Sequence, residues 1–146
     1  MYVRRANVYD FSDICTMLTE MHIEADIDLT SISPKKLSEV VVKTINDGVV
    51  LVAVGDNGKI AGSIGGGTAT EWWSNEPIFG DLWFYVYKDS RKSKAGIDLI
   101  KRFIRHGAGM HIKLGHVYNG DMDRKDKFYE RLGLRKVGST YIMENK

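Results

Sequence analysis

The sequence is poor in the features that mark several common protein classes. It has one cysteine and two prolines, and its 21 basic residues are nearly balanced by 19 acidic ones, for a net charge of +2. A single cysteine excludes a disulfide within the chain and fits a reducing compartment. The balanced charge does not indicate nucleic-acid binding. No hydrophobic run approaches the length of a membrane span or a secretion signal. We therefore expect a soluble cytoplasmic protein without nucleic-acid or membrane partners.

The length sets the number of domains. A chain of 146 residues, 43% of them hydrophobic, can bury one sizeable core and is too short for two. No internal repeat, low-complexity tract or interdomain linker interrupts it. We expect a single domain over residues 1–146.

The apolar pattern predicts strands and helices in an order that defines a fold class. Asp56, Asn57 and Gly58 are a strong hairpin signal, and Ser33 with Pro34 is typical of a helix start. The expected strands are 2–6, 49–54, 60–64, 81–87, 110–117 and 137–143. Of the four expected helices, the first two begin at residues 10 and 34, and the other two span 93–106 and 124–132. This order predicts an α/β (α+β) fold. Its central sheet is mainly antiparallel, with one parallel pair made by a crossover through helix 93–106.

The clearest functional signal is a strand that leads through a short basic turn into a helix. The turn consists of Arg91, Lys92, Ser93, Lys94, Ala95 and Gly96. The first amides of a helix lack intrahelical partners and carry the positive end of its dipole, so such a turn can hold a diphosphate. The small residues allow close approach of the main chain, and the basic ones add charge. An ordinary corner with a solvated basic face is the alternative interpretation.

Three segments together resemble the GNAT N-acetyltransferase superfamily, over nearly the whole chain. The opening Val3–Ala6, with Asp10 before a helix, is similar to the first strand and helix of that family. Phe84–Gly96 resembles its acyl-CoA pyrophosphate motif, Q/R-x-x-G-x-G/A, and Phe128–Leu134 resembles its late Y-x-x-x-G-F signature. Lys94 departs from the first motif because it replaces the middle glycine.

The resemblance implies a GNAT-like acyl-CoA N-acyltransferase fold that binds acetyl-CoA as the acyl donor. It implies a bulge in strand 81–87 that splays this strand from its parallel neighbour and exposes main-chain groups to the pantetheine arm. Val86 would contact pantetheine through its amide, Phe84 and Tyr85 would lie nearest the acyl group, and residues 91–96 would hold the pyrophosphate. Lys94 would either pair with a phosphate or obstruct the turn. The reaction would be direct transfer to a primary amine of a small-molecule or peptide acceptor, in a monomer or a homodimer.

The catalytic residues are less fully specified than the cofactor site. The resemblance places the hydroxyl of Tyr129 near the cofactor sulfur, where a phenol with an ordinary pKa of about 10 can protonate a departing thiolate. His116 is a candidate general base because an unperturbed imidazole has a pKa of about 6.5, although a lone strand histidine is more often structural. Glu71, Glu76 and Asp81 lie before the cofactor strand. A chain of water molecules could also remove the proton.

Two further patterns bear on function. The glycine-rich run 62–67 lacks the G-x-G-x-x-G spacing and leads into no helix, which favours backbone clearance within a strand over nucleotide binding. The histidines show no metal-ligand spacing, so we expect no metal. The alternative to an enzyme is a catalytically silent binding or regulatory module of the same fold, or a virion-associated structural module.

Overall fold

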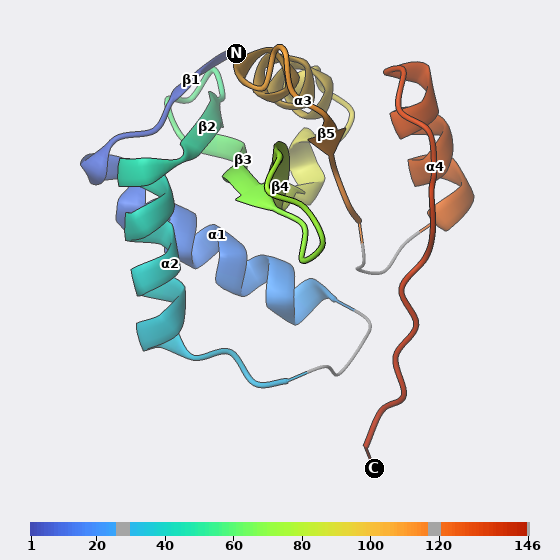
Figure 1. The fold of residues 1–146 in the computed structure, drawn as a ribbon. Coiled ribbons are helices and arrows are strands. Elements are labelled where there is room, and N and C mark those ends of the chain that lie inside the picture. Colours follow the sequence, from blue (N-terminus) through green and yellow to red (C-terminus); the bar gives the residue numbers. More distant parts are fainter. Residues whose placement is uncertain (26–29, 117–120, 146) are drawn as a thin grey trace.

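Strands that are neighbours in sequence are also neighbours in the sheet. The computed structural model describes residues 1–25, 30–116 and 121–145, and in this part of the chain five strands form one sheet in the order β1-β2-β3-β4-β5 (Figure 1). The strands are β1 (Tyr2–Arg5), β2 (Val49–Val54), β3 (Ile60–Thr70), β4 (Pro77–Val86) and β5 (Ile112–Lys113). The helices are α1 (Phe11–Glu24), α2 (Pro34–Asp47), α3 (Ala95–His106) and α4 (Met122–Arg131), with 3-10 turns η1 (Val8–Asp10) and η2 (Lys88–Ser90).

The pairing confirms the predicted fold class. β1 to β4 pair antiparallel in sequence order, whereas β4 and β5 are parallel and joined by the crossover through α3. The hairpin between β2 and β3 turns at Gly58, whose φ of 79° lies in the region that glycine adopts without strain. β3 and β4 are both longer than predicted. They pair with each other along their length, from Gly62 with Val86 to Thr70 with Pro77.

Helices cover both faces of the sheet, so each face has its own core. On one face, α1 and α2 bury a cluster with strands β2 and β4, consisting of Ile14, Leu18, Val41, Val50, Val52, Val54 and Trp83. On the other face, α3 buries a second cluster, consisting of Leu51, Ala53, Ile64, Phe79, Val86, Ala95, Leu99, Ile100 and Phe103 (Figure 1). Because successive strand residues point to opposite faces, Trp83 and Val86 of β4 belong to different cores.

The helix starts follow local signals that the sequence contains. The side chain of Ser33 accepts a hydrogen bond from the Lys36 amide, and Pro34 occupies the first turn of α2. Asn7 and Asp10 form a capping box ahead of α1, and Asp10 also pairs with Arg4 at 2.7 Å. None of the described helices is both long and apolar enough to cross a membrane.

The predicted last strand, 137–143, is wrong. Residues 134–145 form neither helix nor strand, and the side chains of Val137, Tyr141 and Met143 are exposed. The predicted strand 110–117 is also reduced to two paired residues within its described part, 110–116. A β-branched, aromatic segment becomes a strand only where a neighbour satisfies its backbone, and after α4 this segment leads away from the sheet (Figure 1).

Candidate functional site

β4 contains a bulge beyond which it separates from β5. Gly65 pairs with Trp83 and Gly66 pairs with Asp81, so Leu82 is an extra residue in β4 without a partner in β3. Among the described residues, which stop at 116 after β5, the parallel pair is limited to Phe79 with Ile112 and Gly80 with Lys113. The bulge and the splayed parallel pair that the resemblance implied are therefore present.

The open edge of β4 presents backbone groups to this split. The amide of Tyr87 donates to the carbonyl of Ala61 at 2.9 Å, which turns the main-chain groups of Tyr87 toward β3. Because these groups alternate in direction along a strand, those of Phe84 and Val86 point the other way, toward the split. This orientation is the one that a backbone contact between Val86 and a bound pantetheine requires.

The glycine-rich run provides backbone clearance, as predicted. A Cβ atom on Gly65 would overlap the indole ring of Trp83, and one on Gly66 would overlap the carbonyl of Gly80. The Trp83 ring lies across β3 and its Nε1 donates to the hydroxyl of Ser63 at 3.1 Å. Glycines thus allow a large ring and the bulged backbone to lie close to β3.

The basic turn leads directly into the first turn of α3. Lys94 is the N-cap residue of the helix, without a side-chain cap, and both Lys92 and Lys94 are exposed. Ser93 is engaged within the turn, because its hydroxyl donates to the carbonyl of Ser90 and accepts from the Ala95 amide at 3.2 Å. A Cβ on Gly96 would lie 3.5 Å from the ring of Phe84, so a small residue here leaves room beside the open edge of β4.

Arg91 is placed differently from a free phosphate ligand. Its Nε donates to the Val86 carbonyl at 2.9 Å, and its Nη2 lies 2.8 Å from Oε2 of Glu24, at the end of α1. The guanidinium also lies over the ring of Tyr85, 5.4 Å from the centroid. Tyr85 points to the α1 side of the sheet, where its hydroxyl donates to Glu24 at 2.6 Å. No sequence motif marks Glu24, because nothing local to α1 indicates a partner 67 residues away.

Tyr129 and His116, the two predicted catalytic residues, lie together. Their rings stack with centroids 5.4 Å apart. Nε2 of His116 lies 3.0 Å from Asp126, whereas its Nδ1 is buried without a hydrogen-bond partner among the described residues. Burial raises the pKa of the Tyr129 phenol, and the nearby carboxylate of Asp81 adds to the shift. Tyr129 is therefore protonated at neutral pH.

Of the three acids noted before the cofactor strand, Asp81 lies at the split. Its carboxylate accepts from the Gly115 amide at 3.2 Å and so replaces a ladder bond where β5 leaves β4. Burial raises the pKa of Asp81 to about 6. Glu71 instead pairs with Lys113 at 2.6 Å, and Glu76 is exposed. Asp81 is a half-buried acid at a bulge, and the sequence alone could not distinguish it from Glu71 and Glu76.

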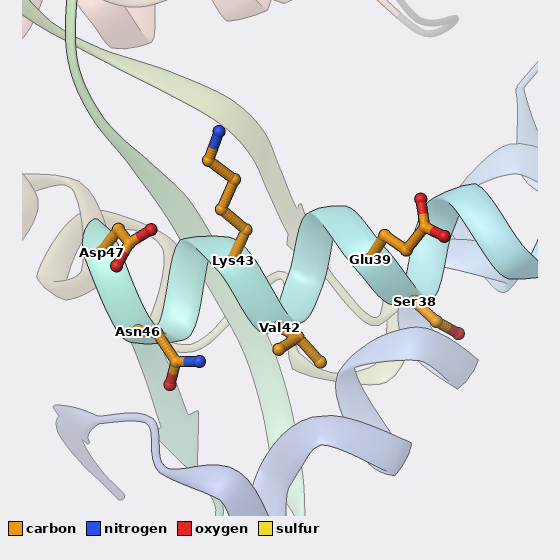
Figure 2. Close-up of a pocket in the computed structure, with 6 residues that line it drawn as sticks. All are labelled: Ser38, Glu39, Val42, Lys43, Asn46 and Asp47. Atoms are coloured by element: carbon orange, nitrogen blue, oxygen red, sulfur yellow. The ribbon is translucent and has the colours of Figure 1, made fainter.

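Two surface pockets lie outside the split. One runs along the outer side of α2, and all its lining residues come from that helix: Ser38, Glu39, Val42, Lys43, Asn46 and Asp47 (Figure 2). The other lies between the end of α1 and the end of β4, beside Glu24 and Tyr85. In the part of the chain that the structure describes, no three His, Cys, Asp or Glu side chains gather as a metal site requires.

Comparison with known proteins supports the fold. Neither a protein-family model nor a curated protein sequence matches the chain. Solved structures match over almost its full length. An acetyltransferase from Trypanosoma brucei has 17% identity and a TM-score of 0.69, with 99% of both chains covered. An aminoglycoside 6'-N-acetyltransferase from Acinetobacter haemolyticus has 14% identity and a TM-score of 0.72, with coverage of 100% of this chain and 99% of that one.

A third match has the same character. Glucosamine-6-phosphate N-acetyltransferase from Arabidopsis thaliana has 14% identity and a TM-score of 0.70, with coverage of 99% of this chain and 98% of that one. At these identities the likeness shows the fold alone. The chain therefore has the GNAT N-acetyltransferase fold, as the sequence motifs predicted.

Proposed function

We propose that this protein is an N-acetyltransferase that moves an acetyl group from acetyl-CoA directly to a primary amine. The observation that carries the proposal is the split between β4 and β5, which lies beside the basic turn at the start of α3. The split offers an open backbone edge to an extended arm, and the helix start offers amides and lysines to a diphosphate. Acetyl-CoA has both of these parts.

Different residues at the split would bind different parts of the donor. The backbone of Phe84 and Val86 faces the split, and the exposed Lys92 and Lys94 flank the start of α3. Gly96 leaves space between the helix and β4. Arg91 is bonded to Glu24 and to the Val86 carbonyl, so we assign it to supporting the turn rather than to a phosphate.

Tyr129 is the proposed hydrogen-bond donor to the leaving sulfur, which departs as a thiolate. Its phenol is half-buried and keeps its proton at neutral pH, because burial and the nearby Asp81 carboxylate both disfavour ionisation. A thiol with a pKa of about 8.5 leaves readily as a thiolate, so a hydrogen bond from the phenol stabilises the charge that develops on sulfur. The stacked ring of His116 holds the orientation of Tyr129.

Asp81 is the proposed acceptor of the proton that the amine loses. Two observations favour it over His116: its carboxyl lies at the split, and its pKa of about 6 leaves it ionised but still basic near neutral pH. His116 has one ring nitrogen engaged by Asp126, and its other nitrogen is buried. We therefore assign His116 to orienting Tyr129.

The acceptor class is a primary amine on a small molecule or a peptide, and the location we propose is the cytoplasm, where the acetyl donor is available. Asp81 and Tyr129 lie close together at the split, and both can take part in proton transfer. This arrangement favours an enzyme over a catalytically silent binding module. Amines, polyamines, aminoglycosides and peptides form the panel to screen for release of free thiol.

Calorimetric titration with acetyl-CoA tests the donor. We expect saturable binding with a Kd below about 1 mM, the upper end of ordinary substrate affinities. Gly96→Leu should weaken binding about tenfold or more, because a bulky side chain between α3 and Phe84 keeps phosphate from the helix amides. Gly138→Leu, in open space on the exposed tail, is the matched control and should bind as the parent does. No heat and no thermal stabilisation at millimolar acetyl-CoA would exclude the proposed function.

A further inference from the structure

The last residue of α1 accepts hydrogen bonds from β4 and from the basic turn, and it also lies near a lysine of η2. Oε2 of Glu24 accepts from the Tyr85 hydroxyl at 2.6 Å and from Nη2 of Arg91 at 2.8 Å, and Oε1 lies 3.8 Å from Nζ of Lys88. The Glu24 side chain is only 18% exposed. These hydrogen bonds and charges lower the pKa of Glu24 to about 2, so it is a carboxylate at any pH the protein meets.

Arg91 links Glu24 to the backbone of β4. While Nη2 pairs with Glu24, Nε of the same guanidinium donates to the Val86 carbonyl at 2.9 Å. The carbonyl and amide of one strand residue point to the same side, so the group that Arg91 holds is on the edge that faces the split. Because the guanidinium is planar and rigid, fixing one of its ends fixes the other.

We propose that Glu24 is a positioning residue for acetyl-CoA binding, which acts through Arg91 on the open backbone edge at Val86. The inference rests on the proposed function. Glu24 lies on the α1 side of the sheet, and its contacts with Tyr85, Arg91 and Lys88 do not require it to touch the donor. It keeps the end of β4 and the following turn in the geometry that the donor needs.

This role separates Arg91 from the two exposed lysines of the turn. Because Glu24 compensates the charge of Arg91, removing both charges in the double variant should leave the salt dependence of binding unchanged. Lys92 and Lys94 are exposed beside the helix start, and their removal should reduce that dependence. The same titrations therefore distinguish a brace from a phosphate ligand.

The test is a double-mutant cycle on acetyl-CoA affinity, measured by calorimetry at several salt concentrations. Glu24→Ala and Arg91→Ala should each weaken binding about tenfold, and the double variant should be no weaker than either single one. Glu24→Gln, which retains an acceptor, should lose less. Glu20→Ala is the matched control, because it removes an exposed glutamate one turn earlier in α1, and it should bind within about twofold of the parent.

Three results would overturn the inference. If Glu24→Ala bound acetyl-CoA as tightly as the parent, the contact between Glu24 and Arg91 would not matter for binding. Additive losses, with a smaller salt dependence in the double variant than in the parent, would show that Arg91 contacts phosphate directly. A parent protein that does not bind acetyl-CoA at all would remove the proposed function and this inference with it. Tyr85→Phe, which deletes one hydrogen bond to Glu24 and keeps the ring, tests the same contact if Glu24→Ala unfolds; unchanged affinity in that variant also counts against the proposal.

Discussion

The two helices that flank the split are held in different ways. α3 buries Ala95, Leu99, Ile100 and Phe103 in the core against β2, β3 and β4. No residue of α4, all of which the structure describes, is fully buried, and it meets that core through half-buried side chains such as Phe128 and Tyr129. The proposed donor-binding side thus shares the stability of the core, whereas we expect the side that carries Tyr129 to open at a lower free-energy cost.

Polar contacts at the surface take the place of a core for α4. Asp126 lies 3.0 Å from His116 and 3.1 Å from Lys136, and the ring of His116 stacks on Tyr129. Surface ion pairs stabilise by about 0–1 kcal/mol each, so they fix an orientation more than they add stability. The proposed catalytic residues are therefore held by weaker contacts than the proposed cofactor site.

The largest expected effect is on the core side of this comparison. Phe103→Ala should lower the free energy of unfolding by about 3–5 kcal/mol, because Phe103 is completely buried and its ring packs on Phe79. Phe128→Ala in α4, where the ring is half-buried, should cost about 1 kcal/mol. Urea unfolding followed by circular dichroism measures both. Equal losses would contradict the difference between the helices, as would equal hydrogen-exchange protection of α3 and α4.

The next effect concerns the proton acceptor at the split. Asp81→Asn keeps the shape of the side chain but removes its basicity, so we expect kcat/KM to fall by about 10²- to 10³-fold. In the parent protein, kcat/KM should decline as pH falls through about 6, since protonated Asp81 accepts no proton. The Asn variant should lack this titration. A parental pH profile in that variant would assign the base elsewhere, and His116→Asn is the comparison that identifies it.

Asp81→Asn should lower activity but raise the free energy of unfolding at neutral pH. The folded-state pKa of Asp81 is raised above its unfolded value, so the folded state binds more protons between pH 4 and 6 and stability falls as pH rises through that window. Above pH 6 the half-buried carboxylate costs about 3 kcal/mol, most of which Asp81→Asn should recover. Unfolding free energies at pH 4 and pH 7 measure this difference. A variant that is less stable than the parent at pH 7 would show that the bond to the Gly115 amide outweighs the burial.

The smallest expected effect is on the loosely held side. Tyr129→Phe should lower kcat by about 10²-fold at most and leave acetyl-CoA affinity within a few fold, because the hydroxyl serves only when charge develops on sulfur. Single-turnover kinetics with an accepted amine measures the chemical step. Phe128→Tyr, next to it on α4, is a control that leaves the Tyr129 hydroxyl in place. An unchanged chemical step in Tyr129→Phe would give this residue a purely structural role beside His116.

The sequence alone determined those features that depend on neighbouring residues. Ser33 and Pro34 set the start of α2, and Gly58 allowed the hairpin that makes β2 and β3 adjacent. The apolar run 49–54 could only be a buried strand, and the basic turn before α3 was visible as a motif. Each of these rests on backbone and side-chain preferences that act within a few residues.

The tertiary structure decided what depends on residues far apart in the chain. Arg91 pairs with Glu24 across 67 residues, and the pKa of Asp81 rises only because folding buries it. The strand expected at 137–143 has the composition of a strand, but in the described structure no neighbouring strand satisfies its backbone. Strand pairing and burial depend on which distant residues lie nearby in the fold, and the local sequence pattern does not specify them.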